Sequence, residues 1–315
     1  MEKLIGNTPM VKIKYRYQGN IGYVYAKLEY YNYTGSIKDR IAYYILIKSK
    51  ELGLLKDGQA IVEATSGNTG ISFSALGALM HHPVHIFMPD WASVERVNIM
   101  KLYGANVYLV SREEGGFQEA IRRSEEFASE INGFLPKQFE NTLNIDAHYN
   151  GTGREILDAL PNVDTFVSGI GTGGTLIGVA KRLKEYNKDI QIVALEPSSM
   201  PLISEGKIIG NHKIEGIGDD FIPDIVDRSL IDKIVLINDG DAINMSRLLA
   251  KKLGLGVGIS SGANFLASVI AKGKCVATVF ADDFKKYLST DLTKDVDLNP
   301  EFISNQIELL DLEVV

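Results

Sequence analysis

Residues 165–175 read TFVSGIGTGGT, a short apolar and β-branched run followed directly by a glycine-rich turn. Thr165–Ser168 is predicted to be a buried strand, and a helix-forming segment begins at Gly174. A glycine-rich turn between a strand and a helix leaves backbone N–H groups and the positive helix end free to bind an anion. Two threonine hydroxyls in the turn add further donors. We therefore predict a phosphate-binding loop at Gly169–Thr175.

The same turn also fits the pattern GxGxxG through Gly169, Gly171 and Gly174, and Glu196 ends the next predicted strand. In dinucleotide-binding folds an acidic residue at that place binds the ribose. The loop by itself therefore leaves three interpretations open: a phosphate loop for another cofactor, a nicotinamide dehydrogenase, or a tight structural turn.

Apolar and β-branched runs alternate with helix-period segments on both sides of this turn. The predicted strands are Tyr23–Leu28, Ala60–Glu63, Val84–Met88, Val107–Val110, Thr165–Ser168, Ile190–Leu195, Ile234–Ile237 and Val276–Phe280. The predicted helices are Ile37–Leu52, Asn68–Leu79, Val94–Tyr103, Gly116–Ile131, Gly174–Tyr186, Asp241–Leu253 and Gly262–Ala271. This alternation is typical of an α/β protein with parallel sheets. Leu135–Asn150 is polar and less regular, and we expect it to join two α/β units.

Composition favours an enzyme over a nucleic-acid-binding protein. The chain has 315 residues, enough for one large or two medium domains. Its 33 basic and 40 acidic residues give a net charge of −7, which disfavours a nucleic-acid-binding surface. Cys275 is the only cysteine, so no intramolecular disulfide or thiolate zinc site is expected, and no other metal site is predicted. Because the sequence shows neither a signal-peptide pattern nor an apolar stretch of membrane-spanning length, we expect a cytoplasmic enzyme.

Two further segments carry polar groups at predicted helix starts. Thr34–Arg40 places Lys38 at the start of a helix, where partial burial and the positive helix end lower the pKa of an amine. Thr65–Gly70 consists only of Thr, Ser, Gly and Asn, and it offers donors for a carboxylate. Taken singly, Lys38 is most simply a surface lysine, and Thr65–Gly70 also suits a helix cap. Together with the glycine-rich turn, they suit a Schiff-base cofactor with a phosphate tail and an amino-acid substrate.

Taken together, these segments resemble fold-type II pyridoxal phosphate enzymes, most closely the cysteine synthase and cystathionine β-synthase group. The likeness extends along nearly the whole chain. Its other motifs are Ile5–Pro9, Met88-Pro89, Glu95-Arg96, Gly104-Ala105, Gln138–Asn141, Glu196-Pro197, Gly216–Gly218, Gly258–Ala263 and Tyr287–Ser289. A dehydrogenase is disfavoured, because it leaves Lys38 and Thr65–Gly70 without a role.

The resemblance implies two α/β domains with pyridoxal 5′-phosphate in the cleft between them. The smaller, mobile domain would comprise residues 1–11 and 33–142, and the larger one residues 12–32 and 143–315. It also implies a homodimer that acts on a small amino acid.

The resemblance assigns a role to each motif residue. Lys38 would form the Schiff base and move the Cα proton. Asn68 would hydrogen-bond the 3′-oxygen of the cofactor, and Ser260 would meet the pyridine nitrogen. The phosphate would be bound by Gly171, Thr172, Gly173, Gly174 and Thr175. The substrate would be bound by Thr65, Ser66, Gly67, Thr69, Gln138 and Gly218.

The segment Gly216–Phe221 departs from the family at Asp219, where cysteine synthases tend to have a small residue and cystathionine synthases a tyrosine. A carboxylate there would favour departure of hydrosulfide and act as general base toward water. We therefore predict a cysteine lyase that releases hydrogen sulfide from L-cysteine and adds water to the aminoacrylate, giving L-serine. Asp219 could instead be a turn residue. The Asp282-Asp283 pair, elsewhere in the chain, is expected to be a solvated turn.

Other activities stay open. Cysteine synthase, which makes L-cysteine from O-acetylserine and sulfide, is the first alternative, and cystathionine β-synthase is the next. A catalytically weak relative that serves as a binding partner is disfavoured, because Lys38 and the cofactor motifs are intact.

Overall fold

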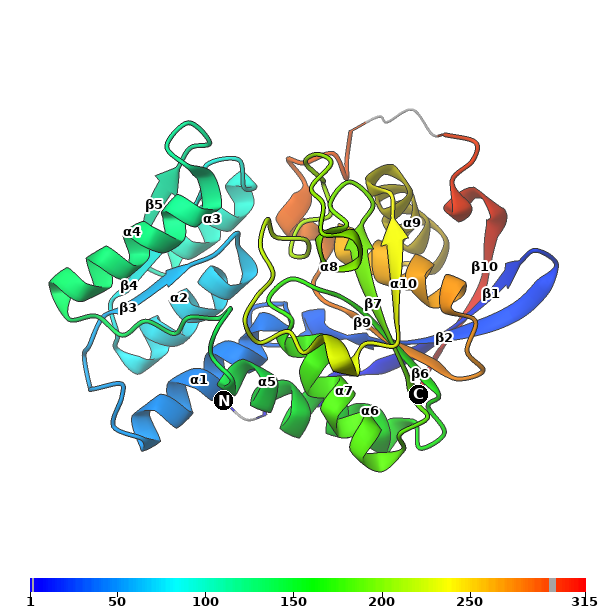
Figure 1. Cartoon of the computed structure of the whole chain (residues 1–315), viewed down its shortest axis with the longest axis horizontal. Coiled ribbons are helices and arrows are strands. Elements are labelled where there is room, and N and C mark those ends of the chain that lie inside the picture. The colour runs from blue at the N-terminus through cyan, green and yellow to red at the C-terminus, as the bar shows by residue number, and fades with distance from the viewer. Residues whose placement is uncertain (2, 295–298) are drawn as a thin grey trace.

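The computed structural model describes residue 1, residues 3–294 and residues 299–315. The chain forms two α/β units that lie side by side, each built around its own sheet (Figure 1). The strands are β1 (Met10–Tyr17), β2 (Asn20–Leu28), β3 (Ile61–Ala64), β4 (Val84–Pro89), β5 (Asn106–Val110), β6 (Thr165–Gly169), β7 (Gln191–Pro197), β8 (Lys233–Ile237), β9 (Val276–Phe280) and β10 (Ile307–Val314).

The helices lie mainly between the parallel strands. They are α1 (Lys38–Glu51), α2 (Asn68–Met80), α3 (Val94–Leu102), α4 (Gly116–Ile131), α5 (Leu143–Ala147), α6 (Arg154–Ala159), α7 (Gly174–Tyr186), α8 (Leu202–Glu205), α9 (Asp239–Leu253) and α10 (Ile259–Ala271). Short 3-10 segments are η1 (Glu29–Tyr31), η3 (Arg228–Leu230), η4 (Phe284–Tyr287) and η5 (Ile303–Gln306), and η2 (His148–Gly153) is a π-helical segment. The predicted α/β class is confirmed.

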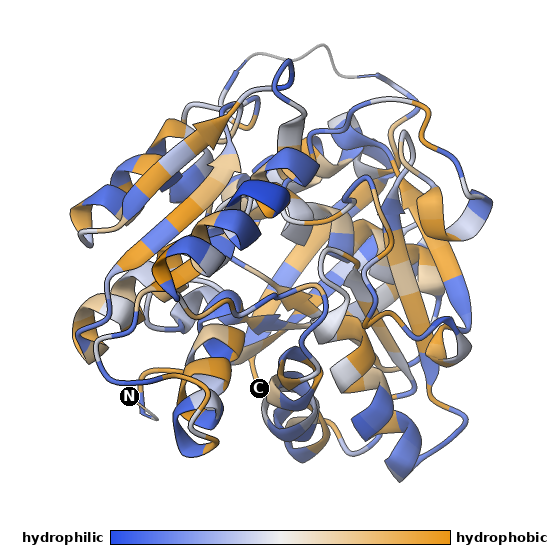
Figure 2. Ribbon diagram, turned by 60° about the vertical axis from the view of Figure 1, so that its left-hand side comes forward, coloured by the Kyte–Doolittle hydropathy of each residue, from blue (hydrophilic) through white to orange (hydrophobic). Residues whose placement is uncertain are grey.

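The larger sheet has seven strands in the order β10-β1-β2-β9-β6-β7-β8. Strands β2, β9, β6, β7 and β8 are parallel, whereas β1 pairs antiparallel with both β2 and β10. Side chains of the strands alternate between the two faces of the sheet, and the apolar ones form one cluster on each face. Helices α9 and α10 pack on one of these clusters, and α6 and α7 pack on the other. The orange strands inside the molecule in Figure 2 show this apolar interior.

The smaller sheet contains β3, β4 and β5, all parallel. Helix α4 covers one face, and α2 and α3 cover the other. Helix α1 packs against both α2 and α5, so it joins the two units. Residues that follow the carboxyl ends of strands in both sheets line the cavities between the units. Parallel α/β proteins bind ligands at such strand ends.

The structure adds elements that the sequence analysis did not predict. Strands β1 and β10 form an antiparallel edge of the larger sheet, and many of the β10 side chains are exposed. Such a strand has no continuous apolar run, so its conformation depends on its partner rather than on its own sequence. The segment expected to be irregular, Leu135–Asn150, contains α5 and the start of η2.

The expected domain division stays a prediction, but one boundary differs from the sheet topology. Met10 and Val11 were assigned to the smaller domain. They belong to β1 of the larger sheet, where they pair with Lys27 and Ala26.

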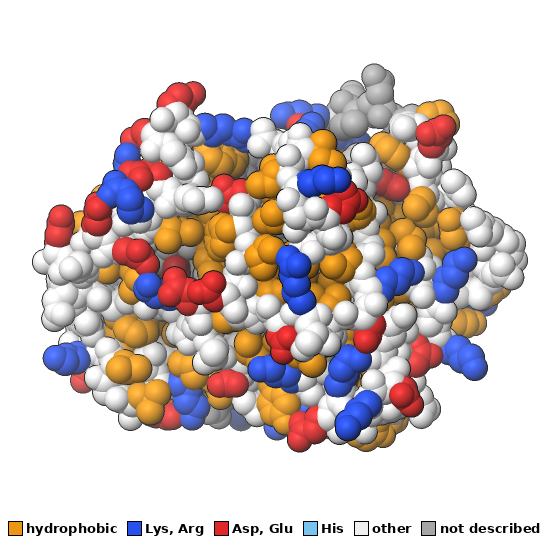
Figure 3. Space-filling model, in the orientation of Figure 1, with side chains coloured by type: hydrophobic (Ala, Val, Ile, Leu, Met, Phe, Trp, Pro, Cys, Tyr) orange, Lys and Arg blue, Asp and Glu red, His pale blue; other side chains and the backbone are white. Residues whose placement is uncertain are grey.

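Two further observations concern the surface charges and the helices. On the face shown in Figure 3, Lys and Arg side chains are interspersed with Asp and Glu, with no extended basic area. Within the part of the chain that is described, no helix combines the length and the apolar character needed to cross a membrane.

Candidate active site

Lys38 is the first residue of α1, at the junction of the two units. The backbone before it is fixed by a hydrogen bond from the Ile37 N–H to the Ala281 carbonyl (2.8 Å), which follows β9 of the larger sheet. The Lys38 side chain lines a cavity between the units. Burial lowers the pKa of Lys38, while the negative charges of Asp219 and Asp282 oppose that change. Lys38 is therefore an amine with a lowered pKa rather than a surface lysine.

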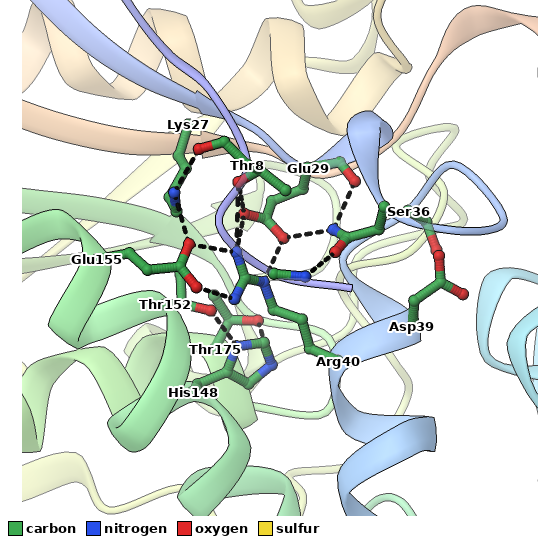
Figure 4. Close-up of polar contacts among 12 residues, drawn as sticks. Thr8, Lys27, Glu29, Ser36, Asp39, Arg40, His148, Thr152, Glu155 and Thr175 are labelled. Carbon is green, nitrogen blue, oxygen red and sulfur yellow. Dashed lines mark hydrogen bonds and ion pairs between the residues drawn. The ribbon is translucent and has the colours of Figure 1, made fainter. Parts of the chain in front are cut away.

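A buried ionic cluster holds the helix that carries Lys38 (Figure 4). Two residues further along α1, Arg40 contacts Glu29 of η1 (Nε–Oε2, 2.6 Å) and Glu155 of α6 (Nη1–Oε1, 2.7 Å). Lys27 of β2 contacts the other oxygen of Glu155 (2.7 Å). These side chains are at least nine-tenths buried, and removing one member of such a pair leaves an uncompensated buried charge. The cluster therefore fixes the start of α1 against the larger sheet.

The glycine-rich turn follows β6 and opens α7, as predicted. Gly173 has φ +88°, and a Cβ there would lie 2.5 Å from Val226 Cγ2, so the turn requires glycine. Gly173, the N-cap residue of α7, has no side chain to cap the helix, and within the described residues only the Gly174 N–H has a side-chain acceptor, Thr172 Oγ1 at 3.4 Å, so the next backbone N–H groups are left for an anion.

Buried polar residues that the sequence analysis missed support this loop. Asn144 donates from Nδ2 to Thr172 Oγ1 (2.9 Å), and His148 Nε2 lies 3.2 Å from Thr175 Oγ1. Burial, together with the charges of Arg40 and Lys38, lowers the pKa of His148 well below its usual value. The imidazole is therefore neutral and adds no charge to the anion site.

One cavity collects seven of the residues predicted to bind the cofactor: Lys38, Asn68, Gly171, Thr172, Gly173, Thr175 and Ser260. Gly174 lies behind them, with its Cα packed against the Asn144 side chain. The cavity holds a buried amide oxygen, Asn68 Oδ1, that has no hydrogen-bond partner among the residues that the structure describes. These groups fit pyridoxal phosphate. The amine suits its aldehyde, and the anion site at the helix start suits its phosphate. The unpaired amide suits its 3′-oxygen, and the hydroxyl suits its pyridine nitrogen. Their individual roles stay predictions.

The small-donor segment joins β3 to the uncapped N-terminus of α2. Thr65 Oγ1 accepts a hydrogen bond from the Gly67 N–H (3.1 Å), and Ser66 lines the mouth of the cleft. Thr69 Oγ1 donates to Gln138 Oε1 (2.7 Å), and Gln138 Nε2 donates to the Ala64 carbonyl (2.9 Å). The structure thus brings the predicted substrate residues of both segments together, with Thr69 and Gln138 already bonded to each other. A substrate carboxylate would use the second Gln138 N–H or replace part of this pairing.

Asp219 lies on the wall of the cleft mouth, a cavity of about 740 Å³ that also exposes Gly218 and Asp220. Burial raises the pKa of Asp219 to about 6; Lys38 opposes this rise and Asp220 adds to it. Asp220 is exposed and accepts a hydrogen bond from Gln118 Nε2 (3.3 Å). The geometry therefore places a carboxyl group that titrates near neutral pH within electrostatic reach of Lys38.

Arg96 of α3 joins both units and was not assigned a role from the sequence. Its guanidinium donates to the Ser66 carbonyl (2.9 Å), pairs with Glu215 (2.6 Å) and stacks over the Tyr287 ring (4.5 Å to the centroid). Arg96 thus links the substrate loop to the segment that leads to Asp219. The sequence contained the Glu95-Arg96 motif but did not predict the contacts of Arg96, because the residues that Arg96 contacts are distant along the chain.

Glu196, the candidate ribose ligand of a dehydrogenase, is committed elsewhere. Its two carboxylate oxygens accept the Ile203 N–H (2.6 Å) and the Ser204 N–H (3.0 Å), and so bind the start of α8. This arrangement removes the residue that favoured a nicotinamide dinucleotide.

Comparisons with known proteins show the family of this chain. The family model described as "Pyridoxal-phosphate dependent enzyme" matches residues 1–280. A cysteine synthase of Staphylococcus aureus is 41% identical over 297 residues, covering 92% of this chain and 95% of that protein. The crystal structure of a hydrogen sulfide-producing enzyme from Fusobacterium nucleatum has a TM-score of 0.96 and 48% identity, covering 100% of this chain and 97% of that one. A cysteine synthase structure from Entamoeba histolytica has a TM-score of 0.86 and 38% identity, covering 96% of this chain and 94% of that one.

Proposed function

Because the chain belongs to the pyridoxal-phosphate dependent enzyme family, we propose that it replaces the thiol of L-cysteine with water, giving L-serine and hydrogen sulfide. The protein is a pyridoxal-phosphate-dependent β-replacement or lyase enzyme of the cysteine synthase type. The proposal that water replaces the thiol depends on one observation, the carboxyl group of Asp219 with a pKa of about 6 at the mouth of the cleft.

The cofactor-binding residues have separate roles at one end of the cavity. Bound pyridoxal phosphate links covalently to amines and withdraws electrons from the α-carbon of an amino acid. Lys38 is the amine that holds it and the base that takes the Cα proton, which its lowered pKa favours. The start of α7 binds the phosphate, and Ser260 presents a neutral hydroxyl to the pyridine nitrogen.

The start of α2 binds the substrate at the other end. Its free N–H groups, with Thr65 and Ser66, receive the carboxylate of the amino acid, and Gln138 adds a side-chain donor. Because these groups lie in the smaller unit, carboxylate binding draws that unit toward the larger one and limits the access of water.

Asp219 directs the replacement step. Once the Cα proton has gone to Lys38, the Cβ–S bond breaks and its electron pair leaves with hydrosulfide. Asp219 then takes a proton from water as the water oxygen bonds to Cβ, and Lys38 returns its proton to Cα. The proton on Asp219 passes to the departing hydrosulfide, which gives hydrogen sulfide and restores the carboxylate. The balance is L-cysteine plus water to L-serine plus hydrogen sulfide. A negative carboxylate beside Cβ also disfavours the return of anionic hydrosulfide.

The comparisons support this choice. The Fusobacterium nucleatum relative is a hydrogen sulfide-producing enzyme, and an Asp-to-Asn mutant of it was crystallised with an α-aminoacrylate intermediate. Several relatives are cysteine synthases, so synthesis of L-cysteine from O-acetylserine and sulfide is the second candidate.

Product analysis in ¹⁸O-labelled water separates the candidates. The protein is incubated with L-cysteine alone, and serine, sulfide and pyruvate are measured. We expect sulfide and serine in equal amounts, with ¹⁸O in the serine hydroxyl. Pyruvate with ammonia would indicate elimination without water addition. Absence of serine, together with cysteine formation from O-acetylserine and sulfide, would assign a cysteine synthase; cystathionine formation from cysteine and homocysteine would assign a cystathionine β-synthase.

We also propose that the enzyme is a cytoplasmic homodimer, on the strength of the family resemblance. Size-exclusion chromatography with light scattering tests the dimer, and cell fractionation tests the location.

A further inference from the structure

Asp282 lies inside the protein, although the sequence suggested a solvated turn. It follows β9 and is 0% exposed. Its backbone forms an isolated antiparallel bridge with Ser36, two residues before Lys38, and its carbonyl accepts the Gly258 N–H (3.0 Å). The turn is buried because it is the place where the start of α1 and the start of α10 both contact the larger sheet. Asp282 is therefore part of the framework around Lys38.

The carboxylate of Asp282 makes two side-chain hydrogen bonds, both through the same oxygen. Oδ2 accepts from Asn68 Nδ2 (2.7 Å) and from the Tyr287 hydroxyl. Oδ1 is buried without a partner and faces Gly258, where a Cβ would lie 2.1 Å from it. Asn68 therefore points its NH₂ group at Asp282 and leaves Oδ1 and one N–H unpaired.

Several charges surround this carboxylate. Lys286 and Arg96 interact with it electrostatically from the segment that includes η4 and from α3. On the side of the cavity, Lys38 interacts electrostatically with both Asp282 and Asp219. The charge of Lys38 also lowers the pKa of His148 of η2. Burial raises the pKa of Asp282, and Lys286, Tyr287, Asn68 and Arg96 oppose that rise. The Lys38 nitrogen is therefore within electrostatic reach of two carboxyl groups, of which Asp219 borders the mouth of the cleft and Asp282 lies behind Asn68.

We propose that Asp282 is a positioning residue of the cofactor site: it fixes the Asn68 amide, and its negative charge favours protonation of the Lys38 nitrogen in the cofactor-bound enzyme. Asp282 does not line the cavity itself, so it acts through Asn68 and through space. The inference rests on the proposed attachment of the cofactor to Lys38. It differs from the role of Asp219, which serves water at the other side of the site.

A pH titration of the visible absorption band of the substrate-free holoenzyme tests this role. The band reports protonation of the nitrogen that links Lys38 to the cofactor. Wild type is compared with two neutral variants, Asp282→Asn and Asp282→Ser, and with the matched control Asp283→Asn. Asp283 is the next residue, and its side chain accepts the Lys285 N–H (3.0 Å). Thermal unfolding and cofactor content are measured for every protein.

Removal of the charge is expected to lower the pH midpoint of the band by about one unit or more in both neutral variants, because a nearby opposite charge favours the protonated form. The control keeps the wild-type midpoint. An unchanged midpoint in a folded, cofactor-loaded Asp282 variant would overturn the proposal, as would failure of both variants to fold while the control folds, since that assigns Asp282 a purely structural role. A wild type without any visible band would instead overturn the attachment to Lys38.

Discussion

Asp219→Asn is the substitution that most directly tests the proposed reaction. Asparagine has nearly the same size as aspartate but cannot accept a proton from water at neutral pH. The substitution keeps the phosphate loop and the substrate loop, and it removes one of the two negative charges that oppose the lowering of the Lys38 pKa. We therefore expect the variant to fold, bind cofactor and release sulfide in a first turnover, but to form serine slowly.

The pKa of Asp219 gives the size of the effect. With a pKa of about 6, the carboxyl group is about nine-tenths ionised at pH 7 and about one-tenth ionised at pH 5. Serine formation by wild type should thus fall about tenfold between these pH values if the ionised form is the base. Asp219→Asn should lose this dependence and lower serine formation at pH 7 by a general-base factor of about 10²–10⁴.

The assay follows serine and sulfide separately from pH 5 to pH 8, in single-turnover and steady-state experiments, with Asp220→Asn as the matched control. Asp220 is exposed and its charge raises the pKa of Asp219. The control should therefore retain serine formation, with its midpoint moved to slightly lower pH. Serine formation by Asp219→Asn at the wild-type rate, with the same pH dependence, would refute the assignment of Asp219 as the base.

Three further substitutions test the rest of the site. Lys38→Ala should abolish turnover and the covalent link to the cofactor; a variant that still turns over, or to which borohydride still fixes the cofactor, would contradict this. Gln138→Ala should weaken L-cysteine binding by about 1.5–3 kcal/mol for the lost charge-assisted hydrogen bond, with cofactor affinity retained; spectral titration with L-cysteine measures both, and equal losses would place Gln138 outside the substrate site. Arg40→Met should lower the free energy of unfolding by about 3–5 kcal/mol, because Glu29 and Glu155 are left buried with fewer partners; denaturant unfolding measures this, and a change below about 1 kcal/mol would show that the cluster contributes little.

Local patterns were enough to predict the core of this fold. The strands with continuous apolar runs and the helices between them follow from periodicity and turn residues, and α4, α7 and β9 have the predicted bounds. The phosphate loop was visible for the same reason, since its glycines and the following helix are contiguous in the chain. Strands β1 and β10 were not visible. The edge strand β10 is half-exposed and pairs with β1, about 300 residues away, and β1 alternates apolar and basic residues and so has no continuous apolar run.

The sequence by itself determined the types of group that the chemistry needs: an amine at Lys38, a run of small donors from Thr65, and a glycine-rich turn before α7. It could not determine how buried each group is or which charges face it. Asp219 and Asp282 are both aspartates in turn-like segments, yet one borders the cleft and the other lies behind Asn68 with no exposed surface. Only the tertiary structure decided that difference, because burial and the charges of Lys38, Arg96 and Lys286 come from segments far apart in the chain and set the pKa of each carboxyl group.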